Sequence, residues 1–333
     1  MIDAHGRTID YMRLSLTDRC NLRCVYCMPE EGVKRLEHND ILRFHEIMTI
    51  VRAAASLGIH RIRLTGGEPL VRKDIQDLVA EIASVEGIDD VSLTTNGVLL
   101  PKMAKDLKRA GLKRVNISLD TLNPQCFAEV TRIGKLQDTL DGIEAALEAG
   151  FDPVKVNAVT VRRLNQDFLA FARMSMDRPL HMRFIEYMPV GGGEENPGCG
   201  WDEGDVISSD EVRDIINRQA IEMGLSPLVP AEDSRPVGGG PARYYRFEGA
   251  QGTVGFISPR SRHFCHECNR LRCTSDGKIM PCLFSDKKFD IKQAAAADDI
   301  EAVRDILMQA VGAKPDDHHD RVGTERGMSQ IGG

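Results

Sequence analysis

The sequence predicts an α/β protein with a parallel sheet, followed by a smaller second region. Six short β-rich runs alternate with amphipathic helical patterns over the first two-thirds of the chain. Several helical patterns end in a glycine just before the next β-rich run, and the alternation stops near residue 225. Strand-helix units in succession imply right-handed crossovers, so the sheet is either an open doubly wound sheet or a full or partial barrel.

The first region contains the predicted strands and helices in regular order. The β-rich runs are residues 11–18, 61–67, 90–97, 114–120, 152–161 and 181–188. The helical patterns between them cover residues 45–58, 74–85, 101–111 and 136–150. Gly58, Gly111 and Gly150 close three of these helices, as expected for glycine just after a helix end.

The second region has a different pattern. A Pro/Gly/acidic loop over residues 189–204 leads to a predicted helix at 208–224, and then a Gly-rich connector leads into a predicted hairpin. We therefore expect one region over residues 8–224 and a smaller one over 225–333.

Composition limits the function classes. The 333 residues include 42% hydrophobic and 28% charged residues, typical of a globular protein. A net charge of -7 argues against a general nucleic-acid binder, and no apolar run is long enough to predict a membrane span. No signal peptide is evident, which favours a cytoplasmic protein. Nine cysteines in that compartment indicate metal binding or catalysis, because disulfides rarely persist there.

A first cysteine cluster directly follows the first predicted strand. Cys20, Cys24 and Cys27 form the pattern C-x3-C-x2-C. Three thiolates on one loop can each bind one iron of a [4Fe-4S] cluster and leave the fourth iron open for a substrate. A structural zinc site would need a fourth ligand, and none is adjacent in the sequence.

A second cysteine cluster lies in the smaller region. Its members are Cys265, Cys268, Cys273 and Cys282. By spacing alone, Cys265 and Cys268 could start a zinc site that is completed by a more distant cysteine or histidine. The residues themselves leave zinc and iron-sulfur open here.

Basic residues occur on predicted strands where apolar residues are expected. They are Arg13, Arg61, Arg63, Lys155 and Arg183, spread over four of the six strands. Strands covered on both faces are usually apolar throughout, and a buried charge is costly unless an anion compensates it. A shared polyanion such as a triphosphate explains the repetition, although any one of these side chains could instead be exposed or paired with a carboxylate.

The first cluster resembles the signature of the radical S-adenosylmethionine enzymes, which have an aromatic residue before the last cysteine, here Tyr26. The "TGGEP" stretch at residues 65–69 resembles a second element of that superfamily. The resemblance implies a partial (β/α)6 barrel of the TIM type and a [4Fe-4S] cluster whose open iron binds S-adenosylmethionine. One electron then cleaves this cofactor to methionine and a 5′-deoxyadenosyl radical.

The second cluster is similar to that of one family within this superfamily, the GTP 3′,8-cyclases of molybdenum cofactor biosynthesis. The shared pattern is C-x2-C-x13-C, formed here by Cys265, Cys268 and Cys282. The resemblance implies a second [4Fe-4S] cluster near the guanine base. In the reaction it implies, the radical removes the ribose 3′ hydrogen of GTP, and C3′ then attacks guanine C8.

The resemblance also implies roles for individual residues. Positions similar to the family's GTP contacts are Arg13, Arg61, Arg63, Thr94, Lys155, Arg270 and Arg272, with Arg61 standing where the family has lysine. Positions expected to contact S-adenosylmethionine are Tyr26, Gly67, Glu68, Ser118 and Met188. Arg183 and the terminal Gly332 and Gly333 are expected in the catalytic machinery, since the family's double-glycine tail enters the active site.

The same resemblance implies partners and leaves alternatives. The expected partners are GTP, a flavodoxin- or ferredoxin-like electron donor and the downstream cyclic pyranopterin monophosphate synthase, and a homodimer is compatible. One alternative is a peptide-modifying radical maturase, which would usually carry more auxiliary cysteines. Another is a zinc-bound structural or interaction protein, distinguished by a colourless sample with zinc and no iron.

Overall fold

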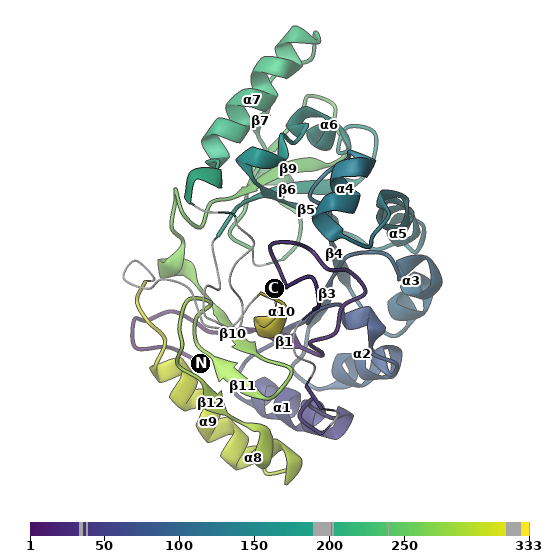
Figure 1. Cartoon of the computed structure of the whole chain (residues 1–333). Helices are drawn as coiled ribbons and strands as arrows, with labels where there is room; N and C mark the ends of the chain where they lie inside the picture. Colours follow the sequence, from purple (N-terminus) through teal and green to yellow (C-terminus); the bar gives the residue numbers. More distant parts are fainter. Residues whose placement is uncertain are drawn as a thin grey trace.

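A computed structural model describes residues 1–32, 36–37, 39–188, 201, 203–238, 240–317 and 328–332. Twelve strands form one sheet in the order β12-β11-β10-β1-β2-β3-β4-β5-β6-β9-β8-β7. Helices α1 to α6 lie in an arc along the outer side of the strands (Figure 1). The chain is therefore an α/β protein, as the sequence predicts.

The central strands are the predicted ones and run parallel. They are β1 (Tyr11–Ser15), β2 (Arg61–Thr65), β3 (Asp90–Thr95), β4 (Arg114–Ser118), β5 (Val154–Thr160) and β6 (Leu180–Glu186). The helices that connect or follow them are α1 (Phe44–Ser56), α2 (Ile75–Ser84), α3 (Leu100–Arg109), α4 (Pro124–Thr131), α5 (Leu136–Glu148) and α6 (Phe168–Arg173). The sequence reasoning missed α4 and α6, which begin with side-chain caps from Asn123 and Asp167.

The later strands extend both edges of this parallel sheet. β9 (Thr253–Ile257) runs parallel to β6, and β10 (Arg270–Cys273) runs parallel to β1. The expected hairpin is confirmed, because β8 (Arg243–Arg246) pairs antiparallel with β9. The pairings found among the described residues do not join β9 to β10, so the strands form a partial barrel that is open at that position.

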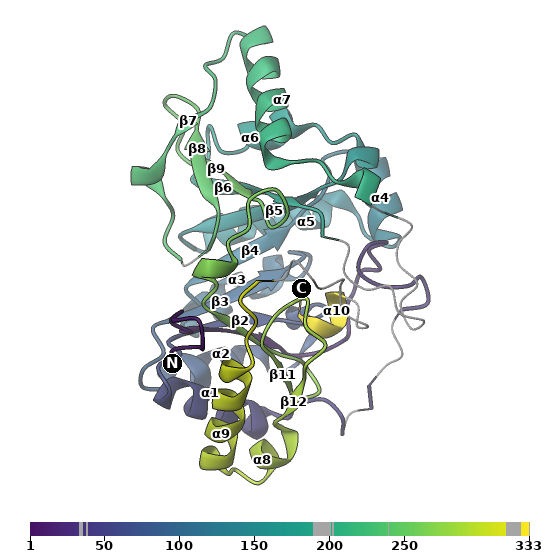
Figure 2. The same cartoon turned by 90° about the vertical axis from the view of Figure 1, so that its left-hand side faces the viewer.

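The remaining elements are the outer strands of the sheet, the later helices and short 3-10 turns. They are β7 (Val229–Pro230), β11 (Lys278–Met280), β12 (Phe289–Asp290), α7 (Ser209–Glu222), α8 (Lys292–Ala296), α9 (Ile300–Gly312), α10 (Met328–Ile331) and the short 3-10 turns η1 (Pro69–Val71), η2 (Arg162–Leu164), η3 (Glu203–Asp205), η4 (Glu232–Ser234) and η5 (Cys265–Glu267). Helices α8 and α9 pack against α1, far from α7 (Figure 2). Within the described residues, no helix is both long enough and apolar enough to cross a bilayer.

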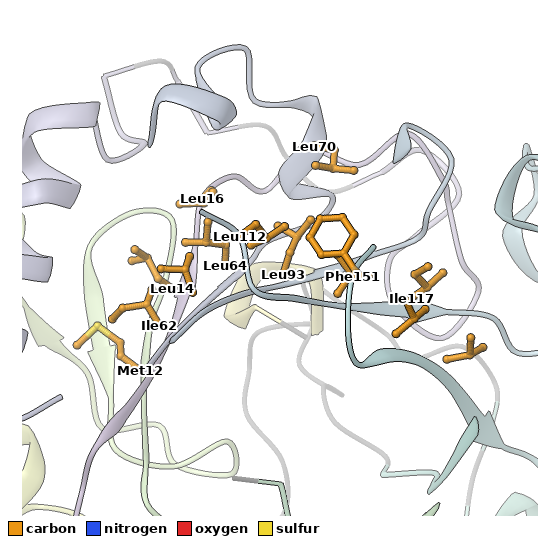
Figure 3. Packing of buried hydrophobic residues seen from close by; sticks show 14 of the residues in the cluster. Met12, Leu14, Leu16, Ile62, Leu64, Leu70, Leu93, Leu112, Ile117 and Phe151 are labelled. Carbon is orange, nitrogen blue, oxygen red and sulfur yellow. The ribbon is translucent and has the colours of Figure 1, made fainter. Parts of the chain in front are cut away.

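The apolar core lies between the strands and the outer helices. Met12 and Leu14 on β1, together with Ile62 and Leu64 on β2, are fully buried in this layer (Figure 3). Side chains alternate across a strand, so Arg13 and Ser15 point to the opposite face of β1. The outer face of the strands holds the fold together, and the inner face carries polar groups.

Candidate functional site

A cavity of about 380 Å³ opens on the inner face of the partial barrel. Its walls come from β1 to β6, from the loops that follow them, and from the second region between residues 238 and 328. In parallel α/β folds, ligands bind beyond the carboxyl ends of the strands. Both cysteine sets lie in these walls: Cys20, Cys24, Cys27, Cys265, Cys268 and Cys282.

The first cysteine loop is held against the turn after β2. Gly67 N donates to Thr17 O at 2.8 Å, and Glu68 N donates to Arg19 O at 2.8 Å. A Cβ at Gly67 would stand 2.4 Å from Arg19 O, closer than any real side chain is found. Only glycine permits this contact, so the "GGE" turn supports the cysteine loop directly.

Glu68 is buried beneath this turn. Its carboxylate accepts from Thr95 Oγ1 at 2.7 Å, from Asn96 N at 2.8 Å and from Leu70 N at 3.0 Å. Burial nevertheless raises the pKa of Glu68 to about 7, against the lowering effect of these hydrogen bonds. A cationic group entering the cavity would be stabilised here when Glu68 is ionised.

Tyr26 is oriented by a residue that the sequence reasoning missed. Its hydroxyl donates to Asp120 Oδ2 at 2.6 Å, and Asp120 Oδ1 accepts from Val159 N at 2.9 Å. The Tyr26 ring stacks on Trp201, with ring centroids 5.3 Å apart. The "SLD" stretch that contains Ser118 was the available signal, since Asp120 closes the same strand end.

Basic side chains from five strands, β1, β2, β5, β6 and β10, meet in the cavity: Arg13, Arg63, Lys155, Arg183 and Arg272. Lys155 and Arg183 are 3% and 5% exposed. Burial, with nearby Arg183 and Arg114, lowers the pKa of Lys155 to about 6. Burial also lowers the pKa of Arg13, with Arg272 adding to the effect. So many cations facing one space require an anion to offset their repulsion.

Some of these guanidinium groups have unused hydrogen-bonding capacity. The Nε atoms of Arg13, Arg63 and Arg270 are buried without a hydrogen-bond partner in the described structure. Arg63 and Arg270 both lie over the ring of Tyr11, at 5.6 and 5.8 Å from its centroid. Buried donors without partners indicate a ligand that supplies acceptor atoms.

Arg61 is not brought to the cavity, in contrast to the expectation for a substrate contact. Its side chain is 30% exposed and lies 3.8 Å from Asp10 Oδ2, at the start of β2. Arg63 lies on the same face of the strand but two residues nearer its carboxyl end. The shared face was predicted correctly, but the position along the strand excludes Arg61 from the cavity lining.

Three further predicted contacts, Thr94, Ser118 and Met188, line the cavity. The tail is also close. Arg272 Nη1 donates to Gly332 O at 3.0 Å, and a Cβ at Gly332 would stand 2.6 Å from Thr65 Oγ1. Gly332 has φ +76°, a conformation that favours glycine. Gly333 lies outside the described residues.

The cysteine sets suit clusters in their chemistry. Among the described residues, no group of three or more His, Cys, Asp or Glu side chains is placed to hold a single metal ion. A [4Fe-4S] cluster has a different requirement, because each thiolate binds its own iron. Three thiols in one cavity wall, beside buried donors and a Gly-Gly turn, fit such a cluster and an additional small ligand.

Comparisons with known proteins identify the family of the chain. Residues 14–174 match the family model of the Radical SAM superfamily, and residues 180–320 match the Molybdenum Cofactor Synthesis C model. A GTP 3′,8-cyclase from Pelotomaculum thermopropionicum is 52% identical over 340 residues, covering 100% of both chains. A GTP 3′,8-cyclase from Heliobacterium modesticaldum is 48% identical over 344 residues, again covering 100% of both chains.

A solved structure supports the fold. Streptococcus suis SuiB bound to S-adenosylmethionine matches with a TM-score of 0.59 at 16% sequence identity, covering 89% of this chain and 65% of that one. The sequence relatives cover the whole chain at close to half identity. The chain therefore belongs to the GTP 3′,8-cyclase family of the radical S-adenosylmethionine superfamily.

Proposed function

We propose that the cavity converts GTP to (8S)-3′,8-cyclo-7,8-dihydroguanosine 5′-triphosphate, the first step of molybdenum cofactor biosynthesis. One observation carries this function: two sets of three cysteines open into a single cavity that is also lined by buried cations. A catalytic cluster needs an open iron beside its substrate, and a nucleoside triphosphate needs several cations. This chain supplies both in the same space.

The first cysteine set, Cys20, Cys24 and Cys27, would hold one [4Fe-4S] cluster. When bound, this cluster supplies the electron that cleaves S-adenosylmethionine to a 5′-deoxyadenosyl radical. Glu68 offers a buried carboxylate to the ammonium of the cofactor, and Gly67 leaves its backbone open to close approach. Tyr26, Ser118 and Met188 complete the cofactor-binding set.

The cations would hold the triphosphate. Arg13, Arg63 and Arg270 each have a buried Nε atom available to an acceptor, and Lys155 adds a compact ammonium. Thr94 and Arg272 complete this set of substrate contacts. Orientation of the triphosphate fixes where the ribose lies, since the bound geometry brings the reacting atoms together.

Arg183, Gly332 and Gly333 would act closest to the reaction. Arg183 Nε donates to Asn157 Oδ1 at 2.9 Å, which fixes the guanidinium inside the cavity. Gly332 packs against Ser15 and Thr65, where a side chain would not fit. A tail end without side chains can exclude water from the cavity while leaving room for substrate.

The second set, Cys265, Cys268 and Cys282, would hold the other [4Fe-4S] cluster near the guanine base. The partners of the reaction are a flavodoxin- or ferredoxin-like electron donor and cyclic pyranopterin monophosphate synthase, which consumes the product. A homodimer and a cytoplasmic location are part of the same proposal. Thiol ligands that must stay reduced are suited to that compartment.

The test uses the full chain, reconstituted with iron and sulfide without oxygen. After addition of dithionite, S-adenosylmethionine and GTP, mass spectrometry follows 5′-deoxyadenosine and any GTP isomer. The expected result is both products together, each dependent on GTP. Deoxyadenosine without a change in GTP would refute the substrate, and absence of both from an iron-loaded sample would refute the radical chemistry.

Two variants separate the roles of the cysteine sets. Cys24→Ser should abolish deoxyadenosine formation, because the first cluster loses a ligand. Cys268→Ser should reduce GTP conversion much more than cleavage of S-adenosylmethionine. Equal loss of both activities in Cys268→Ser, at full occupancy of the first cluster, would contradict separate roles.

A further inference from the structure

A buried lysine lies beside the second cysteine set. Lys314 follows α9 and is 4% exposed. Its Nζ donates to Arg270 O at 2.9 Å and to Pro281 O at 2.8 Å, and its side chain lines the cavity. Arg270 follows Cys268 closely in the chain, and Pro281 precedes Cys282. The ammonium therefore joins the two backbone segments that carry these cysteines.

The charge of Lys314 is not met by a carboxylate. None of the ion pairs formed among the described residues includes Lys314. Two carbonyl oxygens solvate an ammonium only in part, and a buried cation without an anion is costly. The structure therefore requires negative charge close to Lys314.

The neighbouring Arg7 shows the alternative arrangement. Arg7 donates to Cys265 O at 2.8 Å and to Pro315 O at 2.6 Å, so it also ties the second cysteine set to the segment after α9. Its charge, however, is paired with buried Asp3, whose Oδ2 accepts from Arg7 Nε at 2.6 Å. The positive charge of Arg7 is thus neutralised by Asp3, whereas no carboxylate of the described residues pairs with Lys314.

Lys314 lies next to the cysteines of the second set. Its Nζ atom contacts the carbonyl oxygen of Arg270, two residues after Cys268, and that of Pro281, directly before Cys282. Cys268 and Cys282 line the same cavity as Lys314. A cluster bound by these thiolates would place negative charge beside the ammonium.

We infer that Lys314 is a positioning residue for the second cluster, which sets the cluster's reduction potential with one fixed positive charge. Reduction adds a negative charge to an iron-sulfur cluster, and charge near the cluster is one of the factors that tune its potential. A cation at Cys268 stabilises the reduced form more than the oxidised form. The inference rests on the second cluster of the proposed function being bound.

The experiment measures the midpoint potentials of both clusters in the reconstituted full chain by redox titration followed with electron paramagnetic resonance. The signal absent from Cys268→Ser identifies the second cluster. Lys314→Met should shift the second midpoint to a more negative potential and leave the first unchanged. Lys314→Arg keeps the charge and should stay near the wild-type value.

Lys292→Met serves as the matched control. Lys292 also donates to a backbone carbonyl, Asn39 O at 2.6 Å, but this contact is exposed and lies outside the cavity lining. Its loss should change neither potential. Because the titration needs no GTP, its outcome is independent of whether the enzyme cyclises GTP.

An unchanged second midpoint in Lys314→Met, at full iron content, would overturn the inference. If Lys314→Met does not bind the second cluster, the iron content of Lys314→Arg distinguishes the two explanations. A second cluster retained in Lys314→Arg would support a requirement for positive charge at this position. Loss of the cluster from both variants would overturn the electrostatic role, because the guanidinium keeps the positive charge.

Discussion

Proton uptake on GTP binding tests the role of Lys155. Burial and the nearby Arg183, Arg114 and Arg63 lower the pKa of this lysine to about 6. Lys155 is 3% exposed, and its Nζ atom donates to Val237 O at 2.8 Å. A triphosphate would reverse the balance of charge around Lys155, so the lysine should bind a proton when GTP binds.

The size of this effect follows from the pKa of about 6. At a pH of about 8, a group with that pKa is ~99% neutral, so Lys155 should take up about one proton from the buffer when GTP binds. The dissociation constant should rise ~10-fold per pH unit above this pKa until the pKa of the complex is reached. Lys155 should therefore couple GTP affinity to pH.

Isothermal titration calorimetry in two buffers of different ionisation enthalpy measures this proton. The protein carries its clusters and receives neither reductant nor S-adenosylmethionine, so no turnover occurs. Lys155→Arg is the matched control, because arginine stays charged and leaves only the proton exchange of GTP itself. Equal uptake by wild type and Lys155→Arg would refute the reasoning.

The same lysine affects the stability of the GTP-free protein. Its pKa is about 6 in the folded state, below the ordinary value of 10.5. The unfolded chain therefore binds more protons between these values, and the free energy of unfolding should increase as pH rises across this window. Lys155→Met should remove this contribution, which denaturation midpoints at pH values inside the window would show.

Three further predictions concern single positions. Gly332→Ala should weaken the docking of the tail by about 2 kcal/mol, because Gly332 has a positive φ and no space for a Cβ, and turnover should fall roughly 30-fold. Gly312→Ala is the control and should leave turnover unchanged, because nothing lies within 4 Å of the added Cβ. Equal activity of both variants would contradict the packing of the tail. Arg63→Ala should weaken GTP binding by ~10- to 100-fold through loss of charged hydrogen bonds, whereas Arg61→Ala should change it by less than about twofold. Equilibrium binding distinguishes them, and similar losses would place both in the site. Burial raises the pKa of Glu68 to about 7 from 4.5, so the folded state binds more protons in that interval. The free energy of unfolding should then fall as pH rises through it, and Glu68→Gln should flatten this slope in thermal denaturation.

Local patterns were sufficient for the parallel sheet and for the first cysteine set, whereas the second set was assigned from the family resemblance. Strands and helices alternate in hydrophobic period, and Cys20, Cys24 and Cys27 lie within one short loop, so neither required knowledge of distant contacts. The period of two also predicted that Arg63 points to the same face as Arg61. These features depend on neighbours in the chain.

The position of a residue along its strand relative to the cavity could not be predicted from the local sequence pattern. Arg61 and Arg63 share a face, but only the assembled barrel shows that the cavity lies toward the carboxyl end of β2 and leaves Arg61 beside Asp10. Likewise, the sequence pattern assigned the residues of β9 and β10 to the smaller region, whereas the structure pairs these strands with β6 and β1 of the parallel sheet. Such pairings are non-local and have no signature in one strand's residues.

The sequence by itself determined the α/β class and the pattern of the first cysteine set, and it favoured a polyanionic ligand, because these follow from residue type and spacing. Tertiary structure alone placed Lys314 beside the second cysteine set and Gly332 against Ser15 and Thr65. Each of these contacts joins residues far apart in the chain. Their energies depend on burial and on the charges nearby, and both quantities exist only once the sheet edges have assembled.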